Sequence, residues 1–334
     1  MACESGAWNC TRFLVVERSD EINQCYNEYY PIHLAVMQDI KFLEILLQCG
    51  ADVLVKTTTQ QMTVLHVVLS CSRKSAKVTL QTLKMLLDHG CHELINEPDT
   101  LGNTPLHNLI IRYALEESRF GDTKEPRLWN KWDMLQMLTY LFKNGASLSI
   151  NHQVNSALTC ILQHIKDYEF RYELLEMFLK NGGNPNSVGL DGSVSLMACL
   201  MSLMNRDPLQ FLSHHTKEFY KNSILLLCKH GANPNCSSRS NITPMHVLTF
   251  MASRYVQIKE EHKNQAFVFI RKLLLILLQY GLDPNIQEWN IEVYGHILDE
   301  HPKNNYMRQI ELDPSNQLSQ LHEYILQTLM DEAA

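Results

Sequence analysis

Two short signatures alternate strictly along this chain, and internal repetition of this kind constrains a fold more than any single motif. The first is a helix-start signature close to Thr-Pro-Leu-His, clearest at 104–107 and 243–246 and degenerate at 30–33, 63–66, 156–159 and 194–197. The second is a helix-end signature close to Leu-Leu-x-x-Gly, whose glycines are Gly50, Gly90, Gly145, Gly182, Gly231 and Gly281. The alternation predicts six units of two helices each.

Each residue type in these signatures has a physical role. Thr104 can cap the first helix, and Pro105 suits the first turn, where the missing backbone N–H is not needed. The glycines end the second helix, because the residue after a helix often adopts a left-handed conformation. Asn-Pro-Asn at 184–186 and 233–235, and Asp-Pro-Asn at 283–285, predict turns that lead into a projecting hairpin.

The two signatures together resemble those of ankyrin repeats, and the resemblance covers residues 27–290. It implies an all-α solenoid of helix-turn-helix repeats with short projecting hairpin loops. We therefore expect an N-terminal helical cap at 1–29, an ankyrin-repeat solenoid of about six repeats at 30–290, and a C-terminal degenerate repeat or helical cap at 291–334. By the same resemblance, the motif histidines hydrogen-bond neighbouring turns; they are His33, His66, His107 and His246.

The spacing between start and end departs from the constant spacing of the family. It ranges from 20 residues in the first repeat to 41 in the third, and the extra length lies between the two helices. Residues 114–130 are charged and contain Gly121 and Pro126, which predicts a loop there. Residues 254–266 hold few helix breakers, which favours longer helices on both sides. Several repeats are therefore expected to carry long inter-helix insertions.

We find no constellation of residues that predicts catalysis. The sequence lacks a phosphate-binding glycine loop, a nucleophile elbow and a zinc-protease motif. His89, Cys91 and His92 cluster, but no second pair of ligands stands at zinc-finger spacing, so a structural role is favoured. The same holds for His214 and His215. We expect no enzyme activity, no metal and no cofactor within this chain.

Composition narrows the class of partner. The formal net charge is −7 and the pI about 6.1, without a basic stripe, which argues against nucleic acid. The longest aliphatic run, 273–278, is far shorter than the roughly 20 residues that cross a membrane. The ten cysteines lack C-x-x-C spacing and suit free thiols in a reducing compartment. We expect a protein or peptide partner rather than a small molecule, and a location in the cytoplasm or the nucleus.

The resemblance also indicates where a partner binds, because the first helices and hairpin tips of ankyrin stacks line a concave face. The positions four, seven and eight residues after each motif start are unusually apolar here, and exposed apolar patches mark interaction surfaces. Methionine suits a groove that adapts to its ligand. With Trp289 near a hairpin tip, the candidate partner-binding residues are Met37, Ile111, Arg112, His164, Met201, Val247, Phe250, Met251 and Trp289.

Two alternatives for this face stay open. Inter-helix insertions or terminal segments can fold over these side chains and make them ordinary core, or the degenerate repeats can be out of register. Trp289 can equally cover the last repeat. Replacing exposed groove residues would weaken a partner, whereas replacing core residues would unfold the chain.

The sequence therefore predicts a non-catalytic scaffold or adaptor that binds a protein segment through an apolar concave groove and the hairpin tips. One alternative is a substrate-recognition adaptor of a ubiquitin ligase, since residues 317–326 resemble the elongin-binding helix of ankyrin proteins with a SOCS box. His322 stands where that motif has cysteine. Another alternative is the ankyrin portion of a larger multidomain enzyme.

Overall fold

A computed structural model describes residues 21–70, 74–120, 129–147, 157–188, 192–204, 211–238, 241–255 and 260–283. Within these ranges every regular element is a helix, and extended backbone pairs only at two isolated bridges, Tyr26 with Tyr29 and Lys56 with Thr63. The expected all-α fold is confirmed. The chain divides into two compact units, one up to Cys160 and the other from Asp167, with helix α8 (Ala157–His164) at the division.

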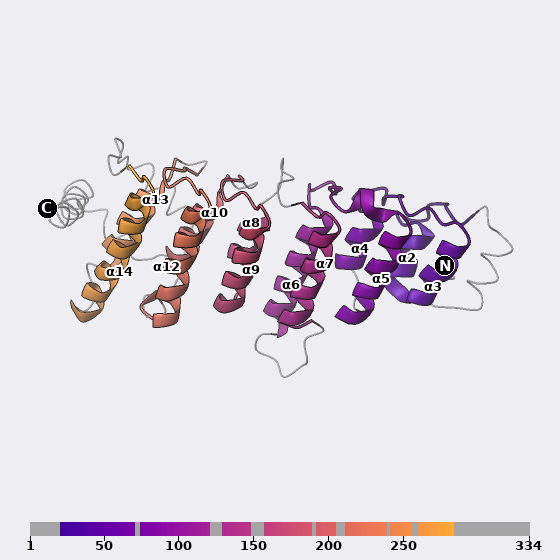
Figure 1. Ribbon diagram of the computed structural model, residues 1–334, viewed down its shortest axis with the longest axis horizontal. Helices are drawn as coiled ribbons and strands as arrows, with labels where there is room; N and C mark the ends of the chain where they lie inside the picture. The colour runs from indigo at the N-terminus through magenta and orange to yellow at the C-terminus, as the bar shows by residue number, and fades with distance from the viewer. Residues whose placement is uncertain are drawn as a thin grey trace. The chain divides into compact units, whose positions relative to one another are not determined.

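The first unit holds three pairs of antiparallel helices. Its first helices α2, α4 and α6 contact one another in that order, and its second helices α5 and α7 also pack together (Figure 1). A 3₁₀ turn, η2 (Cys91–Leu94), follows α5. The three pairs are α2 (Pro31–Gln38) with α3 (Ile40–Gln48), α4 (Val64–Ser70) with α5 (Ala76–Asp88), and α6 (Pro105–Phe120) with α7 (Lys131–Lys143).

The second unit repeats this arrangement. Its first helices are α10 (Ser195–Met204) and α13 (Pro244–Tyr255), and its second helices are α9 (Tyr168–Lys180), α12 (His214–Lys229) and α14 (Glu260–Gln279). Helix α10 pairs with α12, and α13 pairs with α14, while α9, α12 and α14 stack as a row of second helices. The positions of the helices match the repeats expected from the two signatures.

The second helices end in the way that the glycine signature predicts. Gly145 has φ 91°, and its N–H donates to the carbonyl of Phe142 at 3.1 Å. The N–H of Ala146 donates to the carbonyl of Leu141 at 3.0 Å. This pair of bonds is a Schellman motif, which satisfies the last free carbonyls of the helix. The chain can then leave the helix without unpaired backbone groups.

The structure corrects one expectation about the inter-helix insertions. The loop expected at 114–130 is wrong for its first part, because α6 continues as a helix to Phe120. Buried Tyr113 and Ala114 and an ion pair between Arg112 and Glu116, one turn apart, hold this extension in place. At the last repeat, α13 reaches Tyr255 and α14 begins at Glu260, so the expected lengthening of both helices is confirmed.

Candidate functional site

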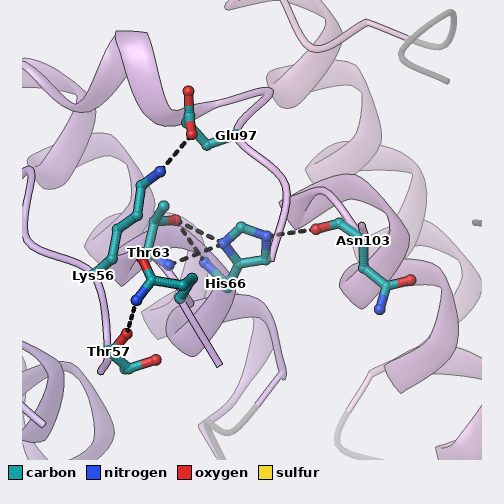
Figure 2. A network of polar contacts seen from close by, with 7 residues as sticks. Lys56, Thr57, Thr63, His66, Glu97 and Asn103 are labelled. Atoms are coloured by element: carbon teal, nitrogen blue, oxygen red, sulfur yellow. Dashed lines mark hydrogen bonds and ion pairs between the residues drawn. The ribbon is translucent and has the colours of Figure 1, made fainter. Parts of the chain in front are cut away.

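In four repeats, the histidine of the helix-start motif is hydrogen-bonded to the first residue of that motif. In the second repeat, the Thr63 backbone N–H donates to Nδ1 of His66 at 3.1 Å, and the Thr63 Oγ1 lies 2.8 Å from the same nitrogen (Figure 2). On its other side, Nε2 of His66 lies 2.8 Å from the carbonyl oxygen of Asn103 in the next repeat. Because Nδ1 accepts a hydrogen bond, the proton of the neutral ring sits on Nε2 and is donated to Asn103. The histidine therefore links two repeats.

The same geometry recurs along the chain. The threonine Oγ1 to histidine Nδ1 distance is 2.8 Å both for Thr104 with His107 and for Thr243 with His246. In the first repeat the Tyr30 N–H donates to Nδ1 of His33 at 3.3 Å. Burial lowers the pKa of His33 to about 4, with a smaller opposing effect from the Val55 carbonyl. Burial also lowers the pKa of His66, so His33 and His66 are neutral structural groups near neutral pH.

Asparagines form a second set of links, which the sequence reasoning missed. Asn186 donates its side-chain N–H to the carbonyl of Gly231 at 2.7 Å and accepts from the backbone N–H of Asn233 at 2.7 Å. Equivalent pairs of bonds join Asn23 to Gly50 and Asp52, Asn96 to Gly145 and Ser147, and Asn235 to Gly281 and Asp283. The recurring Asn-Pro-Asn turns were the available signal, since their last residue makes these bonds.

Successive hairpin loops of the first unit are joined by their backbones. The N–H of Thr58 donates to the carbonyl of Glu28 at 3.2 Å, and the N–H of Thr100 donates to the carbonyl of Gln60 at 2.9 Å. Lys56 and Glu97 add an ion pair of 2.6 Å across two of these loops (Figure 2). Leu101 projects from the third loop with 68% of its surface exposed. The tips therefore form a fixed surface with an apolar side chain available for contact.

The first helices of the first unit present a second surface. Met37 and Ile111 occupy the same repeat position on α2 and α6 and are half-buried, with half-buried Ser70 at that position on α4. Leu115, one turn beyond Ile111 on the same side of α6, is 53% exposed. The sequence reasoning missed Leu115 because it assigned this part of α6 to a loop. We call Met37, Ser70, Ile111 and Leu115 the inner-helix face.

A buried polar cluster supports the end of this face. The Arg112 guanidinium lies 4.2 Å from the ring centroid of Trp129 and makes a 3.2 Å ion pair with Glu116. The Trp129 indole N–H donates to the carbonyl of Lys74 at 3.1 Å. Burial lowers the pKa of Lys74, against the opposing effect of Asp39. Arg112, predicted to contact a partner, is instead 6% exposed and fixes α6 against the start of α7.

Comparison with known proteins finds one family match within this chain. Residues 27–58 match the family model of the ankyrin repeat. This match identifies the first repeat as an ankyrin repeat. A solved ankyrin repeat domain from Acinetobacter baumannii is similar over 76% of this chain and 99% of its own length, with 20% sequence identity and a TM-score of 0.47. Ankyrin repeats are generally protein–protein interaction modules and are typically non-catalytic.

The remaining candidate residues fall into three groups. His164 on α8 is exposed and Met201 on α10 is half-buried. Val247, Phe250 and Met251 on α13 are at most 1% exposed, so the structure favours the core alternative for them. Their helix packs against both α10 and α14, which accounts for this burial. Trp289 and residues 317–326 lie outside the described residues.

The cysteine and metal-ligating side chains of the described residues favour structural roles over reactive ones. Burial raises the pKa of the Cys91 and Cys199 thiols to about 12 and that of Cys228 to about 11, which disfavours a reactive thiolate. In the described ranges, no group of three or more His, Cys, Asp or Glu side chains is placed to hold a metal ion. No helix there is long and apolar enough to cross a membrane.

Proposed function

We propose that this chain is a non-catalytic scaffold or adaptor that binds a segment of another protein on the inner-helix face of its first unit. Met37, Ile111 and Leu115 supply the apolar contacts, and the hairpin tip around Leu101 supplies a second point of attachment. His164 and Met201 remain separate candidate contacts on α8 and α10. Val247, Phe250 and Met251 are left out because they are buried.

Leu115 is the observation that carries this proposal. A leucine that exposes about half of its surface on a helix costs free energy in water, and a partner that covers it recovers about 25 cal/mol for each Å² of apolar surface buried. Its neighbours along the same side of α6 and at the same position on α2 are half-buried apolar side chains. A partly exposed apolar surface, with the small side chain of Ser70 on α4 between its two parts, suits a bound segment with apolar side chains.

The rigidity of the surface also supports binding. Arg112 makes an ion pair with Glu116 and a cation–π contact with Trp129, and the Trp129 indole is hydrogen-bonded to the backbone of Lys74. The histidine links between repeats fix α4 relative to α6. A surface held in advance loses little conformational entropy when it binds, so more of the contact energy appears as affinity.

The test is capture of partners by the full chain from a cell extract, followed by crosslinking mass spectrometry. Leu115→Glu and Met37→Glu are expected to weaken the captured partner about tenfold or more, because each places a charge in an apolar contact. Thr139→Glu, on the exposed side of α7, is the matched control. Thermal unfolding of each variant shows whether the fold is intact. Retained binding by both variants would contradict the proposal.

Two alternative functions imply different binding partners, so experiments can separate them from the proposed one. An adaptor in ubiquitin ligation would bind elongins B and C through residues 317–326, which a pull-down of the full chain with both elongins tests. In that case the inner-helix face would hold the ligase substrate. The ankyrin portion of a larger enzyme would instead bind a segment of its own parent chain.

A further inference from the structure

Equivalent residues on the solvent-facing (outward) sides of the second helices can be compared by counting back from the helix-end glycine. The residue six positions before the helix-end glycine is polar in four repeats, as Glu44, Lys84, Thr139 and Glu176, and aliphatic in the last two, as Leu225 and Leu275. In repeats two to six, the residue thirteen positions before the glycine is Lys77, Trp132, Glu169, Glu218 and Val268, in that order. Helix α14 therefore carries aliphatic side chains at both outward positions.

These side chains form an apolar strip on the outward side of α14. Val268 is 54% exposed and Leu275 is 39% exposed, and they lie two helical turns apart on one side. Leu225 occupies the position of Leu275 on α12, which packs against α14, and it is half-buried. The opposite side of α14 is already used by the core, with Ala266, Phe269, Ile270, Leu273, Leu274 and Leu277. We call Leu225, Val268, Lys272 and Leu275 the α14 outer strip.

The chain itself contains a segment of matching chemistry. Leu318, Leu321, Ile325 and Leu329 recur at helical spacing, which gives one apolar side to a helix in this region. Residues 311–334 carry five acidic side chains and no Lys or Arg. The α14 outer strip has exposed Lys272 between its two aliphatic residues. About 35 residues separate Leu275 from the start of this segment, enough for the chain to turn back over α14.

We propose that residues 311–334 dock as an amphipathic helix on the α14 outer strip, with the leucine series against Val268 and Leu275 and the acidic residues near Lys272. The docked helix removes from water the apolar surface that distinguishes α14 from the earlier second helices. Docking also covers the apolar side of residues 317–326. Elongin binding through that segment would then require its release from α14.

Hydrogen exchange of the full chain tests the proposal. The amides of residues 318–329 are expected to exchange at least about tenfold more slowly than in the isolated peptide 311–334, because docking stabilises the helix. Leu275→Glu is expected to remove most of this protection, and Lys272→Glu to remove part of it. Leu321→Glu places the charge in the segment and leaves α14 unchanged, so it separates lost docking from a damaged repeat.

The control is Thr139→Glu, which adds the same charge at the equivalent position of α7 and is expected to leave exchange at 318–329 unchanged. Exchange of 318–329 at the rate of the isolated peptide would overturn the proposal. So would protection that survives both Leu275→Glu and Leu321→Glu. Protection that disappears on dilution, together with a dimer mass in light scattering, would identify a second copy as the occupant and overturn the intramolecular form.

Discussion

Asn235 is hydrogen-bonded to the backbone of both Gly281 and Asp283, which lie 46 and 48 residues further along the chain. Its side-chain N–H donates to the Gly281 carbonyl at 2.8 Å, and its side-chain oxygen accepts from the N–H of Asp283 at 2.7 Å. In a solenoid each repeat contacts only its neighbours, so the stability of the stack depends on such boundary contacts. The asparagine joins the turn of one repeat to the helix end of the next.

Asn235→Ala is expected to lower the free energy of unfolding of the second unit by about 1–2 kcal/mol. The substitution removes two hydrogen bonds and leaves a carbonyl and an N–H to water, since the site is exposed. Urea unfolding followed by circular dichroism measures the change. Asn222→Ala, on α12 of the same unit, is the comparison and is expected to change stability by less than about 0.5 kcal/mol.

Glu28→Gly is expected to stabilise the first unit by about 0.5–1 kcal/mol, because glycine adopts a left-handed backbone without the steric cost of a Cβ atom. The residue two positions before the motif start has such a backbone in several repeats, with φ 83° at Glu28 and 81° at Gly102. The reciprocal change, Gly102→Ala, is expected to cost about 1–2 kcal/mol. Thermal unfolding of both variants measures these changes in stability. A Glu28→Gly variant that is less stable than the parent, as expected for Gly102→Ala, would contradict the prediction.

The sequence was sufficient for the repeat architecture because each signature reports a local physical requirement. Pro105 and the glycine at 145 mark the start of a first helix and the end of a second helix through backbone geometry alone, and the structure places helix ends there. The roles of the motif histidines followed from the resemblance to ankyrin repeats. The Asn-Pro-Asn turns were recognised as turns, but their cross-repeat bonds depend on a neighbour 45 residues away, as for Asn186 and Gly231.

Exposure was harder to predict than helix position. Met37 and Phe250 stand at the same repeat position, yet one is half-buried and the other 1% exposed. The difference arises from packing by neighbouring helices, which repeat spacing does not encode. Arg112 was placed on a binding face because of its position, whereas its charge is satisfied by Glu116 and Trp129 within the fold. The sequence analysis did not predict that α6 continues past Leu115, because residues 114–130 are charged and contain helix breakers.

Acid is expected to destabilise the first unit through its buried histidines. The pKa of His33 is about 4 in the folded chain, against about 6.5 when unfolded, so the unfolded state binds more protons between these values. The contribution of neutral His33 to the free energy of unfolding is fully present above pH 6.5 and decreases as the pH drops toward 4. The total decrease is about 3 kcal/mol. Burial also lowers the pKa of His66, which acts in the same direction.

Urea unfolding between about pH 7.5 and 4.5 measures this dependence, and His33→Gln removes one of its sources. The variant is expected to be less stable than the parent at neutral pH, because it loses the buried ring, but to lose less stability on acidification. A pH dependence of the same size in parent and variant would show that His33 does not contribute to it.

Two tryptophans three residues apart are expected to differ strongly in how much their substitution lowers stability. Trp129 is 1% exposed, contacts the Arg112 guanidinium and donates to the Lys74 carbonyl, whereas Trp132 is 66% exposed on α7. Trp129→Ala is expected to cost about 3–5 kcal/mol, because it leaves a cavity and removes the cover over a buried cation. Trp132→Ala is expected to change stability by less than about 0.5 kcal/mol. Urea unfolding of the two variants measures the contrast, and a cost below about 1 kcal/mol for Trp129→Ala would show that the cluster does not anchor α6 to the start of α7.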